Sequence, residues 1–188
     1  PMPPHVYANW WIKYHHTEEV CMMHEIEPPE DLQIYLNPWF DKLEAYKNYV
    51  AFSPFASTAV PNRNMPVDLA NKIINFIHSL GYKTIQLGLK TDPEINTTIR
   101  PMGGAIFEDA KIAYSCKMLI TVDTGMNWIM SGYKQKVLGF LSAASYPIYA
   151  PVINRMPRNP NAIYLENYNM MDINFNLIKE NILKLLEL

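Results

Sequence analysis

The sequence predicts an α/β domain built on a parallel sheet of about five or six strands, with helices on both faces. From Tyr49 onward, short apolar runs alternate with amphipathic stretches. The short runs are apolar throughout, as in strands that are buried on both faces. The chain has 188 residues, of which 49% are hydrophobic. That length suits one domain with a real core and is too short for two comfortable ones.

Five segments are predicted to be the strands of this sheet. Each is short and apolar, and most are followed by polar or glycine-containing stretches. They are 49–53 (YVAFS), 83–88 (KTIQLG), 117–122 (KMLITV), 136–140 (KVLGF) and 162–165 (AIYL). A short extended piece is expected near Ile99. Strands that alternate with helices in this way indicate a Rossmann-like three-layer domain, in which ligands bind at the carboxyl ends of the strands.

Helices are predicted between and after these strands. The first begins at Pro66 and ends before Gly81, because proline suits a first helical position and glycine a C-terminal one. The second covers about 107–115 and the third 126–131 (MNWIMS). Asp172 is expected to cap a closing helix. The apolar face of that helix is predicted to contain Leu177, Ile178, Ile182, Leu185 and Leu186.

Residues 1–48 differ in character from the rest of the chain. They are aromatic and charged, contain Pro28 and Pro29, and show no clear strand–helix unit. We therefore divide the chain into a linker or wrapping segment, residues 1–48, and a Rossmann-like domain, residues 49–188. The chain does not begin with Met, which indicates a processed product or a part of a longer protein.

Composition and residue spacing argue against nucleic-acid binding, a membrane span and a metal site. A net charge of −2 and a pI near 6.2 do not indicate nucleic-acid binding. No apolar stretch reaches the roughly 18 residues of a membrane span. The two cysteines, Cys21 and Cys116, form no paired motif, so we expect a reducing, cytoplasmic environment. The histidines at 15, 16 and 24 match no zinc-binding spacing, and we expect no metal site.

The loop after the first strand (SPFASTAVPNRNMP) is a candidate anion site. Ser57 and Thr58 supply hydroxyl and backbone N–H groups, and Arg63 supplies a bidentate cation. Pro66 begins a helix whose N-terminus points back at this loop, an arrangement that suits a phosphate or diphosphate. The alternative is an ordinary polar loop with a solvated arginine, since no glycine-rich phosphate motif is present.

A second candidate is the turn between the third strand and its helix (VDTG). A short Thr124–Gly125 turn presents free N–H groups to an anion, and glycine allows a close backbone approach. Asp123 would repel a bare phosphate, so we expect it to orient the turn or to accept a sugar hydroxyl. Alternatively, Asp123 only caps the following helix.

The loop after the second strand contains acidic residues. Asp92 and Glu94 follow a strand end, where acids of dinucleotide-binding folds contact ribose hydroxyls. The alternative is that these charges are simply solvated.

Taken in order, these segments resemble the C-terminal half of the heptosyltransferase-like glycosyltransferases of family 9, which have the GT-B fold. The resemblance covers about residues 48–150. It is based on a Ser/Thr loop with a basic residue before proline, a strand ending in LG, a glycine before a helix, and LITVDTG followed by KVLGF. The expected fold is therefore one half of a GT-B fold.

This resemblance implies a role for each segment. Residues in the places of Ser57, Thr58 and Arg63 hold the donor diphosphate in that family. The acid after the LG strand binds the nucleoside, which here is Asp92 or Glu94. The family motif D(S/T)G lies beside the diphosphate and the sugar, and residues 123–125 match it directly. The implied substrate is a nucleotide sugar, with no other cofactor.

The match is incomplete at two points. Trp128 stands where the family has a histidine, and an indole cannot be a charged donor to phosphate, although it can stack on a base or a sugar. A GT-B enzyme also needs an N-terminal acceptor-binding domain with the usual catalytic base, for which this chain has no room. We therefore expect a metal-independent glycosyltransferase donor-binding domain that lacks its partner half. A non-catalytic nucleotide-binding or assembly module and a nucleotide-sugar epimerase are the alternatives.

Overall fold

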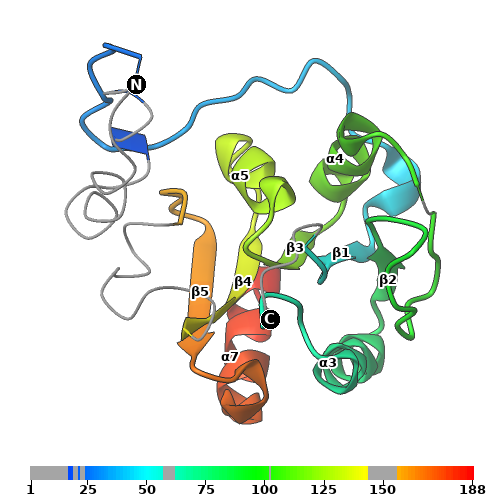
Figure 1. Ribbon diagram of the computed structural model, residues 1–188. Helices are drawn as coiled ribbons and strands as arrows, with labels where there is room; N and C mark the ends of the chain where they lie inside the picture. The colour runs from blue at the N-terminus through cyan, green and yellow to red at the C-terminus, as the bar shows by residue number, and fades with distance from the viewer. Residues whose placement is uncertain (1–16, 19–20, 22–23, 57–61, 102, 144–155) are drawn as a thin grey trace.

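The computed structural model describes residues 17–18, 21, 24–56, 62–101, 103–143 and 156–188 (Figure 1). Within these residues the chain forms a five-stranded sheet with the order β2-β1-β3-β4-β5. Every neighbouring pair of strands is parallel, as predicted. The strands are β1 (Tyr49–Ser53), β2 (Lys83–Gln86), β3 (Met118–Val122), β4 (Val137–Ser142) and β5 (Ala162–Asn167).

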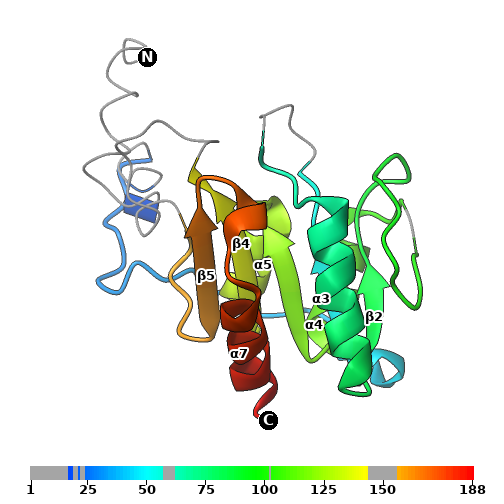
Figure 2. The same cartoon turned by 90° about the horizontal axis from the view of Figure 1, so that it is seen from below.

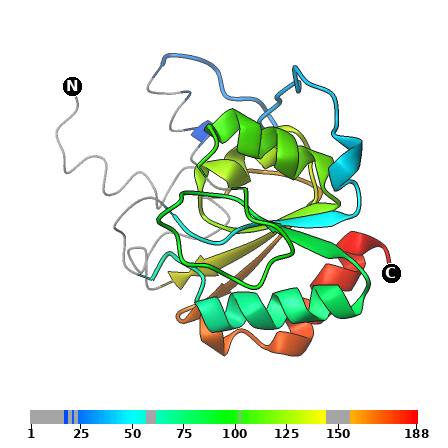
Figure 3. The same cartoon turned by 90° about the vertical axis from the view of Figure 1, so that its right-hand side faces the viewer.

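Helices cover both faces of the sheet, so the domain has three layers (Figure 3). Helices α3 (Val67–Ser79) and α7 (Phe175–Leu186) lie side by side on one face (Figure 2). Helices α4 (Ile106–Ser115) and α5 (Gly125–Gly132) lie on the other. Each face has its own cluster of buried apolar side chains. The predicted Rossmann-like α/β fold is confirmed.

The order of the strands creates a switch point in the middle of the sheet. Strands β1 and β3 are neighbours, with Ser53 opposite Thr121. From β1 the chain crosses through α3 to β2 on one side, whereas from β3 it crosses through α5 to β4 on the other. The connections leave the carboxyl ends of β1 and β3 in opposite directions. Open α/β sheets bind ligands in the crevice that such a divergence leaves.

The closing helix differs from its prediction at two residues. Asp172 ends the short 3-10 helix η3 (Met170–Asp172), and Asn174 caps α7 by accepting a hydrogen bond from the N–H of Asn176 at 2.9 Å. Leu177 is 44% exposed, although the other predicted apolar residues of α7 are buried. The buried stripe is centred on Ile178 and Ile182, and Leu177 lies at its flank, about 100° around the helix from Ile178.

The described residues before β1 include the 3-10 helix η1 (Glu44–Tyr46), and Gln33 forms an isolated parallel bridge with Arg158. The N–H of Leu36 donates to the carbonyl oxygen of Gly132 at 3.0 Å. The ring of Phe40 packs edge-on against Tyr114 and Tyr133, with centroid distances of 6.1 and 5.8 Å. The domain boundary at residue 48 stays a prediction. No helix in the described ranges is both long and apolar enough to cross a membrane.

Candidate functional site

The carboxyl ends of β1 and β3 are joined by hydroxyl hydrogen bonds. The Thr121 hydroxyl on β3 donates to the backbone carbonyl of Ser53 on β1 at 2.9 Å. Its Oγ1 also lies 3.2 Å from Oγ1 of Thr124 in the next turn. These contacts hold the turn after β3 against the end of β1. Two of the three loops with predicted site residues, those after β1 and β3, therefore start at one place.

An ion pair closes the gap between these two loops. Nη2 of Arg63, from the loop after β1, lies 2.6 Å from Oδ2 of Asp123, from the turn after β3. Asp123 is only 7% exposed, and the side chain of Arg63 is 22% exposed. A carboxylate at this depth needs a positive partner to offset its lost hydration. Two residues that the sequence indicated separately are thus in direct contact at the switch point.

The N-terminus of α5 opens at the same place. Thr124 is its N-cap residue in an extended conformation, and the Thr124 side chain makes no capping hydrogen bond. Asp123 precedes the N-cap residue, and its Oδ2 contacts Arg63, an arrangement that does not favour the alternative of a simple helix cap. The first turn of α5 contains no acidic residue. The N–H of Asn127 donates to the carbonyl oxygen of Thr124 at 3.0 Å, so among the described residues the N–H groups of Gly125 and Met126, at the positive end of the helix dipole, remain available to an anion.

Gly125 begins α5 and is exposed. A Cβ placed there would have Ile106 Cδ1 as its nearest described neighbour, at 3.7 Å, which is an ordinary contact. Its φ angle is not positive, in contrast to those of Gly81, Gly88 and Gly103. Neither the backbone nor the packing of the described residues requires glycine here. A ligand that approaches the backbone closely would explain it.

The acids after β2 serve their own loop. Oδ2 of Asp92 accepts a hydrogen bond from the N–H of Leu89 at 2.8 Å. The side chain of Glu94 is 82% exposed and lies 3.9 Å from Nη1 of Arg100. Neither carboxylate contacts Arg63 or Asp123 in the described structure. Glu94 fits the solvated-charge alternative, whereas Asp92 shapes the turn.

The remaining predicted site residues are placed only in part. Trp128 lies on α5, one turn after Thr124, and is partly exposed. Ser57 and Thr58 lie outside the described residues, so their roles stay predictions. Among the described residues, no three His, Cys, Asp or Glu side chains group as a metal site. Burial raises the pKa of the Cys116 thiol to about 12, which keeps it protonated and unreactive near neutral pH.

Sequence reasoning missed two buried polar residues. Asp109, in the first turn of α4, is 7% exposed, and burial raises its pKa to about 6, although a hydrogen bond from the backbone of Gly88 opposes the shift. Asn127 on α5 is fully buried and accepts a hydrogen bond from the Tyr164 hydroxyl at 3.1 Å. A polar residue in the apolar run MNWIMS was the available signal for Asn127. An acid in a first helical turn is too common to identify Asp109.

The strand order and layers place the chain in the Rossmann-like class of α/β domains. More particularly, solved glycosyltransferases contain the same arrangement. The chain aligns with ADP-heptose lps heptosyltransferase II of E. coli at a TM-score of 0.59 and 13% identity, covering 91% of this chain and 51% of that one. A family 9 glycosyl transferase from Veillonella parvula DSM 2008 aligns at 0.59 and 18%, covering 94% and 51%.

A third solved structure, E. coli heptosyltransferase WaaC with ADP, aligns at a TM-score of 0.59 and 11% identity, covering 92% of this chain and 51% of that one. The chain therefore spans about half the length of these solved proteins. At such low identities the likeness establishes the fold. No protein-family model matches the sequence, and no curated protein matches it.

Proposed function

We propose that this chain is the donor-binding half of a glycosyltransferase and that it binds a nucleotide sugar at the switch point between β1 and β3. The observation that carries the proposal is the Arg63–Asp123 pair beside the uncapped N-terminus of α5. A cation and a helix N-terminus at one crevice suit a diphosphate. The fold shared with heptosyltransferases supports the proposal.

In this proposal each residue has a separate role. Arg63 and the backbone N–H group of Gly125 hold the diphosphate, together with the hydroxyls of Ser57 and Thr58. Asp123 orients the guanidinium of Arg63 through Oδ2, and its other oxygen accepts a hydroxyl of the donor sugar. Trp128 stacks on the base or the sugar. The loop containing Asp92 and Glu94 borders the nucleoside.

The proposed transfer needs no metal ion. A departing nucleoside diphosphate gains negative charge, which a guanidinium and a helix dipole can stabilise in place of a divalent cation. The acceptor and the catalytic base belong, in this proposal, to an N-terminal domain or partner chain. The length ratio to the solved glycosyltransferases supports that division.

Calorimetric titration with nucleoside diphosphates and nucleotide sugars tests this function. We expect a diphosphate to bind, and Arg63→Ala to weaken it roughly tenfold to a hundredfold through loss of a charge-assisted pair. Lys136→Ala is the matched control, since Lys136 also has an ion pair, at 2.7 Å to Glu187, but precedes β4 at the opposite edge of the sheet. Nucleotide binding that is equal in the parent and in Arg63→Ala would contradict the assignment.

The tryptophan at position 128 favours a second candidate, a module that binds nucleotide without catalysis. The two candidates differ in turnover once a partner half is supplied, and Trp128→His restores the family residue. Turnover gained only by Trp128→His would support the non-catalytic module. No binding of any nucleotide would favour an assembly role, and sugar isomerisation without an acceptor would identify the epimerase alternative.

A further inference from the structure

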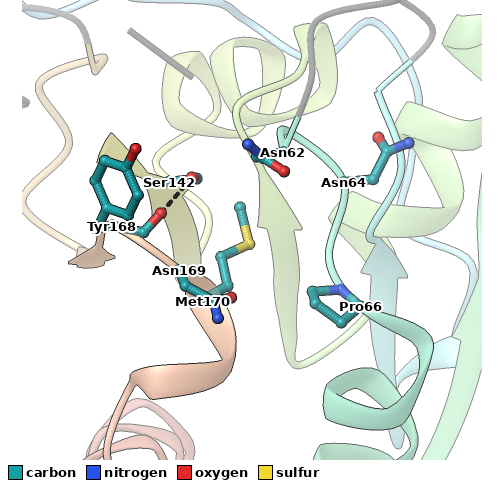
Figure 4. A pocket seen from close by; sticks show the side chains of 7 residues that line it. All are labelled: Asn62, Asn64, Pro66, Ser142, Tyr168, Asn169 and Met170. Carbon is teal, nitrogen blue, oxygen red and sulfur yellow. Dashed lines mark hydrogen bonds between the residues drawn. The ribbon is translucent and has the colours of Figure 1, made fainter. Parts of the chain in front are cut away.

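A cavity of about 230 Å³ opens at the carboxyl edge of the sheet (Figure 4). Its walls come from the chain entering α3, the end of β4, and the segment between β5 and η3. Asn62 and Asn64 flank Arg63 in the sequence, but neither Arg63 nor Asp123 lines the cavity. The lining residues are Asn62, Asn64, Pro66, Ser142, Tyr168, Asn169 and Met170.

Existing hydrogen bonds orient several of these side chains. Oδ1 of Asn64 accepts from the N–H of Ala56 at 2.7 Å, and Oδ1 of Asn169 accepts from the N–H of Met171 at 3.1 Å. Neither amide nitrogen has a hydrogen-bond acceptor within the described residues. Each amide therefore keeps two N–H donors.

The hydroxyl of Ser142 can accept hydrogen bonds, whereas the two amide nitrogens can donate them. It donates to the backbone carbonyl of Tyr168 at 2.9 Å, as the dashed line in Figure 4 shows, and so keeps its lone pairs as acceptors. The cavity thus presents both donors and acceptors. A ligand hydroxyl, which itself donates and accepts, matches such a lining.

Among the residues that the structure describes, none of those that line the cavity is charged. The N-terminus of α3 at Pro66 would attract an anion, but Asp68 in the first turn of this helix opposes it. Tyr168 is 73% exposed, whereas Met170 is 3% exposed. An aromatic ring and a thioether contact apolar C–H groups, while the amides bind hydroxyls. Charge and lining together favour a neutral ligand that has both kinds of surface.

We propose that this cavity binds one neutral, hydroxylated sugar ring. Its volume is below the roughly 300–1,000 Å³ of sites for larger ligands, so a single ring fits it better than a nucleotide. The inference rests on the proposed function and adds a glycosyl subsite beside the diphosphate. The ring can belong to the donor or to a glycan acceptor, because both present the same chemistry.

NMR of the side-chain amides of the full chain tests this subsite. The probes are the methyl glycosides of glucose, mannose and galactose, with inorganic phosphate as the charged comparison. We expect at least one glycoside to shift the amide signals of Asn64 and Asn169, with a Kd in the range of ~1–10 mM. Phosphate should leave these signals in place.

Two variants localise the binding. Asn62→Gly removes an amide at a φ angle of 62°, which glycine tolerates, and Tyr168→Ala removes an exposed ring. Each should weaken glycoside binding roughly two- to tenfold. Tyr35→Ala is the matched control, because Tyr35 is a similarly exposed tyrosine, 66%, that contacts Lys134 away from the cavity. It should leave glycoside binding unchanged.

Competition then identifies the source of the ring. If a nucleotide sugar displaces the glycoside and the matching nucleoside diphosphate does not, the ring is that of the donor. If the nucleotide sugar and the glycoside bind at the same time, the ring is that of the acceptor. Amide signals that no glycoside shifts at ~100 mM, or that only phosphate shifts, would overturn the subsite. That result would not affect nucleotide binding that depends on Arg63. The sugar subsite and the proposed function can therefore be contradicted independently of each other.

Discussion

The turn after β3 and the loop after β2 leave the same edge of the sheet, but they use their acidic residues differently. In the turn after β3, Asp123 is 7% exposed and contacts a guanidinium from a loop that follows another strand. In the loop after β2, Asp92 binds a backbone N–H three residues earlier, and Glu94 is largely exposed. Three acids that look equivalent in sequence therefore have three environments.

Position in the sheet explains this difference. Strand β3 is central and has a strand on each side, whereas β2 is an edge strand with a neighbour on one side only. A buried carboxylate there must be paired, because its lost hydration is costly. An acid beside an edge strand stays hydrated and gains little from an ion pair. Burial, more than residue type, therefore indicates which carboxylate matters to a site.

The largest expected effect on stability comes from Asp123→Ala. It leaves the partly buried Arg63 without its carboxylate, and we expect a loss of about 3 kcal/mol in the free energy of unfolding. Urea unfolding measures this loss. Asp123→Asn should recover part of it, because the amide oxygen can still accept from the guanidinium. A loss below about 0.5 kcal/mol for Asp123→Ala, the range of ordinary surface substitutions, would show that the pair contributes nothing.

A smaller, pH-dependent effect is expected from Asp109, on the helix that follows the loop after β2. Burial raises its pKa from 3.8 to about 6, so the folded protein holds this proton more tightly than the unfolded chain. The stability of the parent should therefore fall as the pH rises from about 4 to about 6 and then stay level. Asp109→Asn cannot ionise and still accepts a hydrogen bond from Gly88. We expect it to be more stable than the parent by roughly 2 kcal/mol above pH 7 and about equal near pH 4.

Urea unfolding of both proteins between pH 4 and pH 8 checks this expectation. Glu108→Gln is the control, since Glu108 is the exposed neighbour of Asp109 in the first turn of α4. It should follow the parent at every pH. An Asp109→Asn protein that also loses stability over the same interval would assign the effect to another group.

The fold was predictable from sequence because its signals are local. The run at 49–53 is apolar in four of its five residues, and it forms β1 with those bounds. The contact between Arg63 and Asp123 was not predictable, because 60 residues separate them and no periodicity relates two loops. The burial of Asp109 was hidden for a similar reason, since it depends on the packing of α4 against the loop at Gly88. Local patterns in the sequence therefore predict helices and strands. Contacts between loops that are distant in the sequence form only when the sheet brings those loops together, so the sequence alone does not predict them.

Asp92→Ala tests the loop after β2. It removes the hydrogen bond to the N–H of Leu89, and we expect a loss of about 1 kcal/mol in the free energy of unfolding. Asp92→Asn, which keeps an acceptor in the same place, should lose less than half of that. Hydrogen exchange at the Leu89 amide should speed up in Asp92→Ala only. Unchanged exchange would mean that the carboxylate does not hold the turn.

The smallest effect is expected from Glu94→Ala. Its carboxylate is 82% exposed and lies 3.9 Å from Nη1 of Arg100, so water and salt screen the pair. The loss in the free energy of unfolding should stay below about 0.5 kcal/mol and should vanish at high salt.

Stability alone cannot separate a solvated charge from one that contacts a nucleoside, but a measurement of ligand binding can. If Glu94 contacts the ribose, Glu94→Ala should weaken nucleoside diphosphate binding roughly threefold to tenfold without changing the melting temperature of the unliganded protein. Equal affinities for the parent and Glu94→Ala would show that Glu94 does not contact the ribose. Asp92 would then be the remaining candidate for the nucleoside contact in this loop.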